Sequence, residues 1–208
     1  MPSDNEKEWE KFHKIFPTYA LMSIETRQDI FEGIAEHCKD GMVFVETGIF
    51  TGGSFCFLGS EVIKRNKSVE MHAVDNFLFE NISQESEDEV IDAHGEEWRG
   101  NLYGLFLDNV ERNGLTEITT VHSMDSIEAS EDFEDDSIDF IHFDGSHDFT
   151  YVKDEIFAWI PKLKENSIIA GHDYPSLRHV IDPIFGEYLT AVNNESYIVE
   201  LGEGFQID

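Results

Sequence analysis

Five apolar runs of the sequence each end in side chains that could bind a ligand or move a proton. They end at Glu46, at Asp75, at Ser123 with Asp125, at Asp144 with His147, and at His172 with Asp173. Carboxylates accept hydrogen bonds and bind hard cations. An imidazole can take up a proton near neutral pH. If the five runs are neighbouring strands of one parallel sheet, these side chains meet at its carboxyl edge and form one site.

The runs have the length and composition of strands, and helical stretches separate them. The expected strands are 42–47, 68–75, 117–123, 137–144 and 166–173, and the expected helices between them are 53–65, about 96–113 and 149–164. This alternation predicts an α/β fold, a Rossmann-like doubly wound and mostly parallel sheet with helices on both faces. A helix over 177–186 and a strand over 197–201 are expected to close it.

Before the sheet we expect a short helix that ends before Pro17 and a second helix from Ser23 to about Cys38. These helices would form an N-terminal cap over 1–40 on a core spanning 41–208, and the whole chain, 1–208, is expected to be a single domain. The acidic segment 83–97 is longer than a tight loop, so we expect it to cover the site.

The first run leads into a glycine-rich turn and a helix, in the stretch VFVETGIFTGGSFCF. A strand, a glycine turn and a helix are a common way to hold a nucleotide-like ligand. Phe50 stands where a dinucleotide-binding turn has its middle glycine, which disfavours a pyrophosphate because that group needs close backbone approach. Asp75 follows the next run, where an acid can accept hydrogen bonds from both hydroxyls of a ribose. The alternatives are a tight turn without a ligand and an Asp75 that caps a helix; Phe77 is expected either against a purine or in the core.

A second block, DFIHFDGSHDFTYVKDEIFAWIPKLKENSIIAGHDY, covers residues 139–174. It combines an apolar strand, Asp-Gly-x-His, a helix with a central Trp, and a strand that ends in Gly-His-Asp-Tyr. Together with the glycine turn, this block resembles the class I S-adenosylmethionine-dependent methyltransferases, in the group of cephalosporin hydroxylase-like and macrolide-sugar O-methyltransferases. The matching residues are Asp144, Gly145, His147, Trp159, Gly171, His172, Asp173 and Tyr174, while Phe149 stands where Tyr is usual.

The resemblance implies S-adenosylmethionine as the cofactor and a small hydroxylated acceptor, such as a sugar, as the substrate. It also assigns the cofactor-binding residues. The methionine part is expected near Glu46, Thr47, Gly48, Gly52, Gly53 and Ser54, the ribose at Asp75, and the adenine along Phe77, Ser123, Met124 and Asp125, with Asp144 completing the site.

The expected catalytic residues are His147 and Asp144. His147 has a suitable ordinary pKa to take a proton from a hydroxyl, although it could instead order the Asp144 loop. Asp144 and Asp173 offer hard oxygen ligands to Mg²⁺, and the neighbouring His172 makes Mn²⁺ or a vacant site equally compatible. In the alternative interpretation, Asp144 and Asp173 only cap their loops.

Three other functions fit parts of the pattern. His142, Asp144 and His172 imitate the facial triad of non-haem iron oxygenases, but such triads usually lie in all-β barrels and would leave the glycine turn unexplained. A nucleoside-binding module without catalysis would use the same cleft. A dehydrogenase that uses NAD is disfavoured by the missing middle glycine and by the second block.

Charge and composition limit the partners. The chain has 14 Lys and Arg against 44 Asp and Glu, which gives a formal net charge of −30. Such a surface repels phosphate backbones and anionic lipids, so we expect neither nucleic acid nor a membrane as partner. The start of the sequence has no apolar signal region, so a cytoplasmic location is expected. Cys38 and Cys56 are expected as buried thiols, and the 17 Phe residues are compatible with a homo-oligomer.

Overall fold

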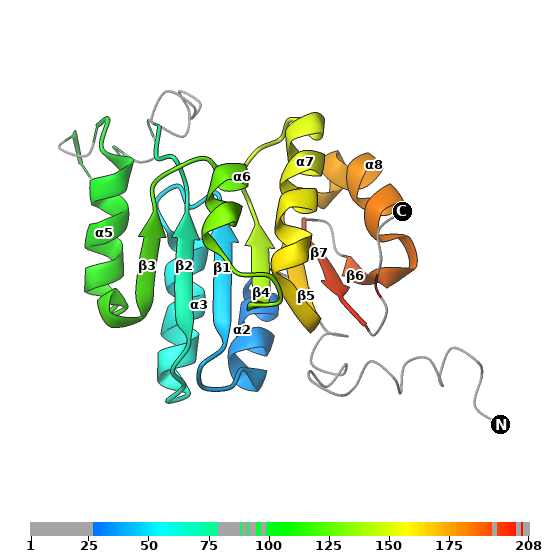
Figure 1. Cartoon of the computed structure of the whole chain (residues 1–208). Helices are drawn as coiled ribbons and strands as arrows, with labels where there is room; N and C mark the ends of the chain where they lie inside the picture. Colours follow the sequence, from blue (N-terminus) through cyan, green and yellow to red (C-terminus); the bar gives the residue numbers. More distant parts are fainter. Residues whose placement is uncertain are drawn as a thin grey trace.

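The computed structural model describes residues 27–78, 99–192 and 195–202, together with the isolated positions 88, 91, 95, 96 and 205. The expected first helix, the cap at Ser23 and most of the expected cover over 83–97 lie outside these residues, and the division into cap and core stays a prediction. The described chain forms a seven-stranded sheet with strand order β3-β2-β1-β4-β5-β7-β6 (Figure 1).

Five strands of the sheet are parallel, as the alternating sequence pattern predicts. They are β1 (Val43–Thr47), β2 (Glu70–Val74), β3 (Thr119–His122), β4 (Ile138–Phe143) and β5 (Leu163–Gly171). β7 (Tyr197–Glu200) pairs antiparallel with β5, and β6 (Leu189–Val192) pairs antiparallel with β7 at the edge. The predicted mostly parallel sheet is therefore confirmed.

Helices cover both faces of the sheet (Figure 1). One core cluster joins the sheet to α2 (Arg27–His37), α3 (Gly53–Lys64) and α5 (Leu102–Arg112). The other joins it to α6 (Ser126–Ala129), α7 (Phe149–Trp159) and α8 (Tyr174–Phe185). Short 3₁₀ turns, η4 (Thr116–Ile118), η5 (Ser130–Asp132), η6 (Ile160–Lys162) and η7 (Gly186–Tyr188), complete the connections.

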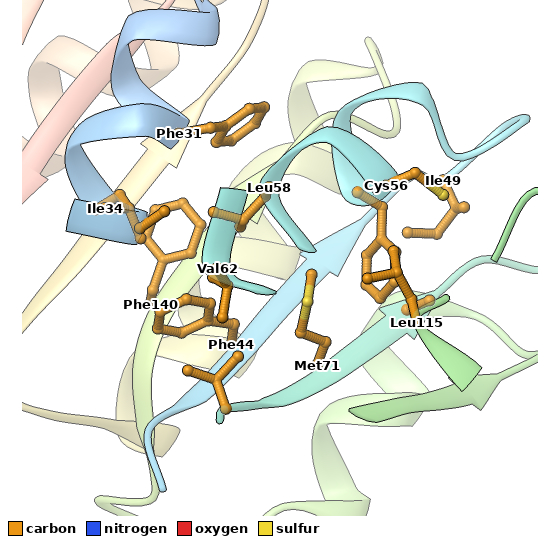
Figure 2. Packing of buried hydrophobic residues seen from close by; sticks show 14 of the residues in the cluster. Phe31, Ile34, Phe44, Ile49, Cys56, Leu58, Val62, Met71, Leu115 and Phe140 are labelled. Carbon is orange, nitrogen blue, oxygen red and sulfur yellow. The ribbon is translucent and has the colours of Figure 1, made fainter. Parts of the chain in front are cut away.

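Strand alternation divides the side chains between these two cores. Phe44 on β1 belongs to the α2–α3 side, where it meets Phe140 of β4 edge to face with ring centroids 5.5 Å apart (Figure 2). Its neighbour Val45 belongs to the opposite side. Both cysteines are free and buried, as expected. Burial raises the pKa of Cys56 to about 12, which disfavours the reactive thiolate form.

Several element boundaries differ from those predicted. The helix expected over 149–164 ends at Trp159, because Pro161 lacks the N–H that a continuing helix needs and a 3₁₀ turn follows. The helix expected from about 96 begins at Leu102, where the Asn101 side chain accepts a hydrogen bond from the Gly104 N–H. The strand β6 was not predicted from the sequence. Within the described residues, no helix combines the length and the apolarity needed to cross a membrane.

Candidate active site

The carboxyl ends of the parallel strands enclose a cleft of about 680 Å³. It opens where the strand order reverses, between β1 and β4, which is where open α/β sheets bind ligands. Residues from the loops after four strands and from α5 and α7 line it: Gly48, Phe50, Val74, Asp75, Asn76, Leu78, Leu102, Met124, Asp125, Ser126, Asp144, Gly145, Ser146, His147, Tyr151 and Glu155. The sequence-based prediction of one shared site at this edge agrees with the geometry.

Gly48 lets the loops after β1 and β4 touch. Its φ of +80° lies in the left-handed region, and a Cβ atom there would be 2.3 Å from the Cα of Gly145 and 2.4 Å from the backbone of Asp144. The turn continues with Phe50 at a φ of +53° and reaches Gly52, also left-handed, as the N-cap of α3. The turn therefore depends on backbone conformations that few residues tolerate. At Gly48, any side chain would also collide with the backbone of Asp144 and Gly145.

The Asp75 carboxylate holds this turn from the neighbouring strand. Its Oδ2 accepts hydrogen bonds from the backbone N–H groups of Ile49 (2.7 Å) and Phe50 (3.0 Å), and its Oδ1 accepts one from the N–H of Phe77 (2.7 Å). The side chain also lines the cleft. A carboxylate has about four acceptor positions, so Asp75 can shape the turn and still accept a hydrogen bond from a ligand.

The far end of the cleft, beside α6 and α7, is polar. Asp125 caps α6 by accepting from the N–H groups of Ile127 and Glu128, and it also accepts from the Tyr151 hydroxyl at 2.8 Å. Ser126 accepts a hydrogen bond from the indole N–H of Trp159 at 3.0 Å. Four residues that line the cleft on α5, α6 and α7 were not predicted as site residues: Leu102, Ser126, Tyr151 and Glu155.

Beneath the glycine turn lies a buried pair of ionisable side chains. Glu46 and His142 are direct neighbours across β1 and β4, are 2% and 1% exposed, and approach to 3.7 Å between Oε1 and Nδ1. The Ser54 hydroxyl at the start of α3 donates to Glu46, where the positive end of the helix also favours a carboxylate. Glu46 thus connects the end of β1 with the start of α3, beneath the glycine turn.

Asp144, His172, Asp173 and His147 form the rim of the cleft on the β4–β5 side. His172 Nδ1 lies 3.3 Å from both Asp144 Oδ1 and Asp173 Oδ2, and ligand atoms of these three residues all lie within 4.8 Å of one another. Asp173 also meets His147, with 2.7 Å between Oδ2 and Nε2. Asp173 starts α8 in a left-handed conformation without capping it by its side chain, which argues against a role as a simple helix cap.

The predicted site residues do not all reach the cleft. Gly48, Asp75, Met124, Asp125, Asp144 and His147 line it. Glu46 and Thr47 lie beneath it, buried. Gly52 and Gly53 line a separate hollow between α3 and α5.

Two residues predicted along an adenine do not line this cleft. Ser123 is exposed and is not among the described residues that line the cleft. Phe77 is in the core, stacked on Phe106 with ring centroids 5.6 Å apart. Ser123 follows the last residue of β3 and is exposed, whereas Ser126 begins α6, is buried and contacts Trp159.

The alternative iron triad does not form. Within the described residues, His142 groups with Glu46 and Asp144, whereas His172 groups with Asp144 and Asp173, so the two histidines do not belong to one set of ligand atoms. The fold is also α/β rather than all-β.

A family model described as a methyltransferase domain matches residues 45–174, more than half of the chain. The chain belongs to this methyltransferase family. The matched residues include the glycine turn, Asp75 and the whole rim, so the family assignment covers the cleft. The resemblance to methyltransferases that the sequence motifs indicated is confirmed.

Similar proteins support the same fold. The O-methyltransferase NovP superposes with a TM-score of 0.61 at 13% identity, covering 85% of this chain and 80% of that one. A putative rRNA-methylase from Clostridium thermocellum gives 0.59 at 11% identity, covering 87% and 98%, and precorrin-6y C5,15-methyltransferase from Geobacter metallireducens GS-15 gives 0.53 at 13%, covering 83% and 86%. A stretch of 52 residues is 42% identical to the uncharacterized protein y4gI of Sinorhizobium fredii (strain NBRC 101917 / NGR234). That stretch is 25% of this chain and only 6% of that protein.

Proposed function

We propose that the protein binds S-adenosylmethionine in this cleft and transfers its methyl group to a hydroxyl of a small acceptor. The observation that carries the proposal is the cleft itself, in a chain of the methyltransferase family. Gly48 and Asp144 border one half of it, where a methionine moiety fits close to backbone, and Asp75 and Asp125 border the other, where ribose and base can be hydrogen-bonded.

The reaction needs little from the protein besides alignment and proton removal. The acceptor oxygen forms a bond to the methyl carbon while the bond between that carbon and sulfur breaks. The electron pair of the broken bond stays on sulfur, which becomes a neutral thioether. Alignment of the two reacting molecules in one cleft supplies a large part of the rate enhancement. The acceptor hydroxyl must also lose its proton, and this requires a base at the rim.

His147 is the base in this proposal. Because a carboxylate only accepts hydrogen bonds, the 2.7 Å contact to Asp173 places the ring proton on Nε2 and leaves Nδ1 as the acceptor. Asp173 then orients the imidazole and stabilises the cation that forms. The side chain of His147 is 68% exposed, so it faces the space where an acceptor enters.

The acceptor class follows from charge. A chain with a formal charge of −30 favours a neutral or cationic small molecule over RNA. A sugar hydroxyl fits this requirement. Among the similar structures, NovP is described as an O-methyltransferase, and at 13% identity it shows the shared fold alone. The rRNA-methylase among them shows only that the fold is shared, at 11% identity.

A divalent cation is a second candidate feature of the same rim. Asp144, His172 and Asp173 offer two oxygens and one imidazole nitrogen within 4.8 Å, a donor set that suits Mg²⁺ or Mn²⁺. Such an ion would lower the pKa of an acceptor hydroxyl. Turnover after treatment with EDTA, with Mg²⁺ or Mn²⁺ then restored separately, tests whether an ion is used.

Calorimetric titration with S-adenosylhomocysteine, with NAD as the control ligand, tests the cofactor. We expect micromolar binding that falls at least about tenfold in Asp75→Asn, since one polar contact to a ligand is worth about 1.4 kcal/mol or more. Asp139→Asn is the matched control. Asp139 also accepts a backbone hydrogen bond, from Val43 at 2.9 Å, but at the opposite edge of the sheet. Binding of NAD instead, or of neither ligand, would refute the proposal.

A further inference from the structure

Glu155 is a buried acid that opens onto the cleft and has no part in the reaction described above. It lies on α7 and is 2% exposed, yet its side chain forms part of the cleft wall. Val152, Ile156 and Trp159 are its neighbours on the same buried side of the helix. A carboxyl group in the middle of an apolar helix stripe is costly unless it has a function or a partner.

Among the described residues, none with a fixed positive charge is found to influence Glu155. Ser126 hydrogen bonds to it with the hydroxyl that already accepts from Trp159, and Thr47 of β1 lies beside it. The titratable groups that face it are Asp125 at the start of α6, Tyr151 on its own helix and Tyr197 on β7. Among the described residues that line the cleft there is neither a lysine nor an arginine. Burial accordingly raises the pKa of Glu155 to about 7, and the hydrogen bond from Ser126 offsets only part of that rise.

We infer that Glu155 makes the cleft sensitive to the charge of the bound ligand, so that the cationic sulfonium of S-adenosylmethionine is preferred over the neutral thioether of S-adenosylhomocysteine. This inference rests on the proposed function and adds a residue that selects substrate over product.

The mechanism is electrostatic. Before the cofactor binds, Glu155 is about half protonated near neutral pH, because burial disfavours its charged form. A sulfonium in the cleft favours the carboxylate, so the carboxyl group releases its proton to solvent when the cofactor binds. After methyl transfer the sulfur is neutral, and Glu155 takes a proton back from solvent. The product then loses this attraction and dissociates more readily.

The test compares the dissociation constants of the two ligands at pH 6 and pH 8. If the sulfonium lowers the pKa of Glu155 by about one unit, the preference for S-adenosylmethionine over S-adenosylhomocysteine rises roughly fivefold between these pH values. In Glu155→Gln, which keeps the size and the hydrogen bond, this rise should disappear. Glu128→Gln is the matched control, because Glu128 is an exposed residue of α6, and it should behave as the wild type.

A second measurement does not depend on the variant. Calorimetry of the wild-type protein in two buffers of different ionisation enthalpy counts protons released on binding, and we expect release with S-adenosylmethionine but not with S-adenosylhomocysteine. An unchanged pH dependence in Glu155→Gln, or equal proton release with both ligands, would overturn the inference and leave the proposed function intact. If the wild type binds neither ligand, the proposed function itself fails.

Discussion

Replacing Gly48 with alanine should force apart two loops that the cleft requires in contact. The substitution has two separable costs. The left-handed backbone costs an alanine roughly 1–2 kcal/mol. The new Cβ atom would lie 2.3 Å from the Cα of Gly145, a backbone atom that cannot rotate away. Such overpacking adds roughly 1–3 kcal/mol, so we expect a total loss of about 2–5 kcal/mol.

Gly41 provides a matched control. It has the same φ of +80°, but a Cβ atom there would meet nothing within 4 Å. Gly41→Ala should therefore lose only the backbone part, roughly 1–2 kcal/mol. Urea denaturation of both variants measures the difference directly, provided that the dependence on urea concentration has the same slope.

Ligand binding gives the second measurement. The displaced loops in Gly48→Ala should abolish calorimetric binding of S-adenosylhomocysteine, while Gly41→Ala binds as the wild type does. If Gly48→Ala proved no less stable than Gly41→Ala, the close approach of the β1 and β4 loops would not be a constraint on the fold. If it bound the ligand normally, the methionine part would not lie against this turn.

Three further predictions follow from single contacts. His147→Gln should lower kcat about 10²–10⁴-fold and flatten the acidic limb of the pH–rate profile, with the affinity for S-adenosylhomocysteine unchanged; a weakened affinity would indicate a binding role instead. Trp159→Phe removes the 3.0 Å hydrogen bond to Ser126 and should cost about 1–3 kcal/mol in urea denaturation, whereas no loss would mean that this bond is dispensable. Burial raises the pKa of Glu200 from 4.5 to about 7, so the native state holds this proton more tightly than the unfolded chain. Glu200 therefore stabilises the native state fully below pH 4.5, and this part of the free energy of unfolding, up to about 3 kcal/mol, is lost as the pH rises through 7. In urea denaturation at a series of pH values, Glu200→Gln should remove this decline in stability.

The alternation of apolar runs and helical stretches was sufficient to predict the parallel sheet. Parallel strands end at the same edge of a sheet, so residues that follow them, such as Gly48, Asp125 and Asp144, were expected at one edge. The strand order, with β1 beside β4, then brought Gly48 and Asp144 together. β6 and the position of β7 between β5 and β6 were not predicted, because the pairing of strands depends on contacts between segments that are far apart in the sequence.

Local sequence determined which polar residues stand at the ends of strands, and only the tertiary structure decided what each of them contacts. Asp75 was expected to face a ribose, and its oxygens also hold the backbone of a turn from another strand. Glu155 stands in the apolar stripe of α7 with Val152 and Trp159, a signal that the sequence contains, but its place in the cleft wall depends on how α7 packs against β1 and α6. The physical reason is that strand and helix periods arise within a few residues, whereas burial and hydrogen-bond partners are supplied by segments far away in the chain.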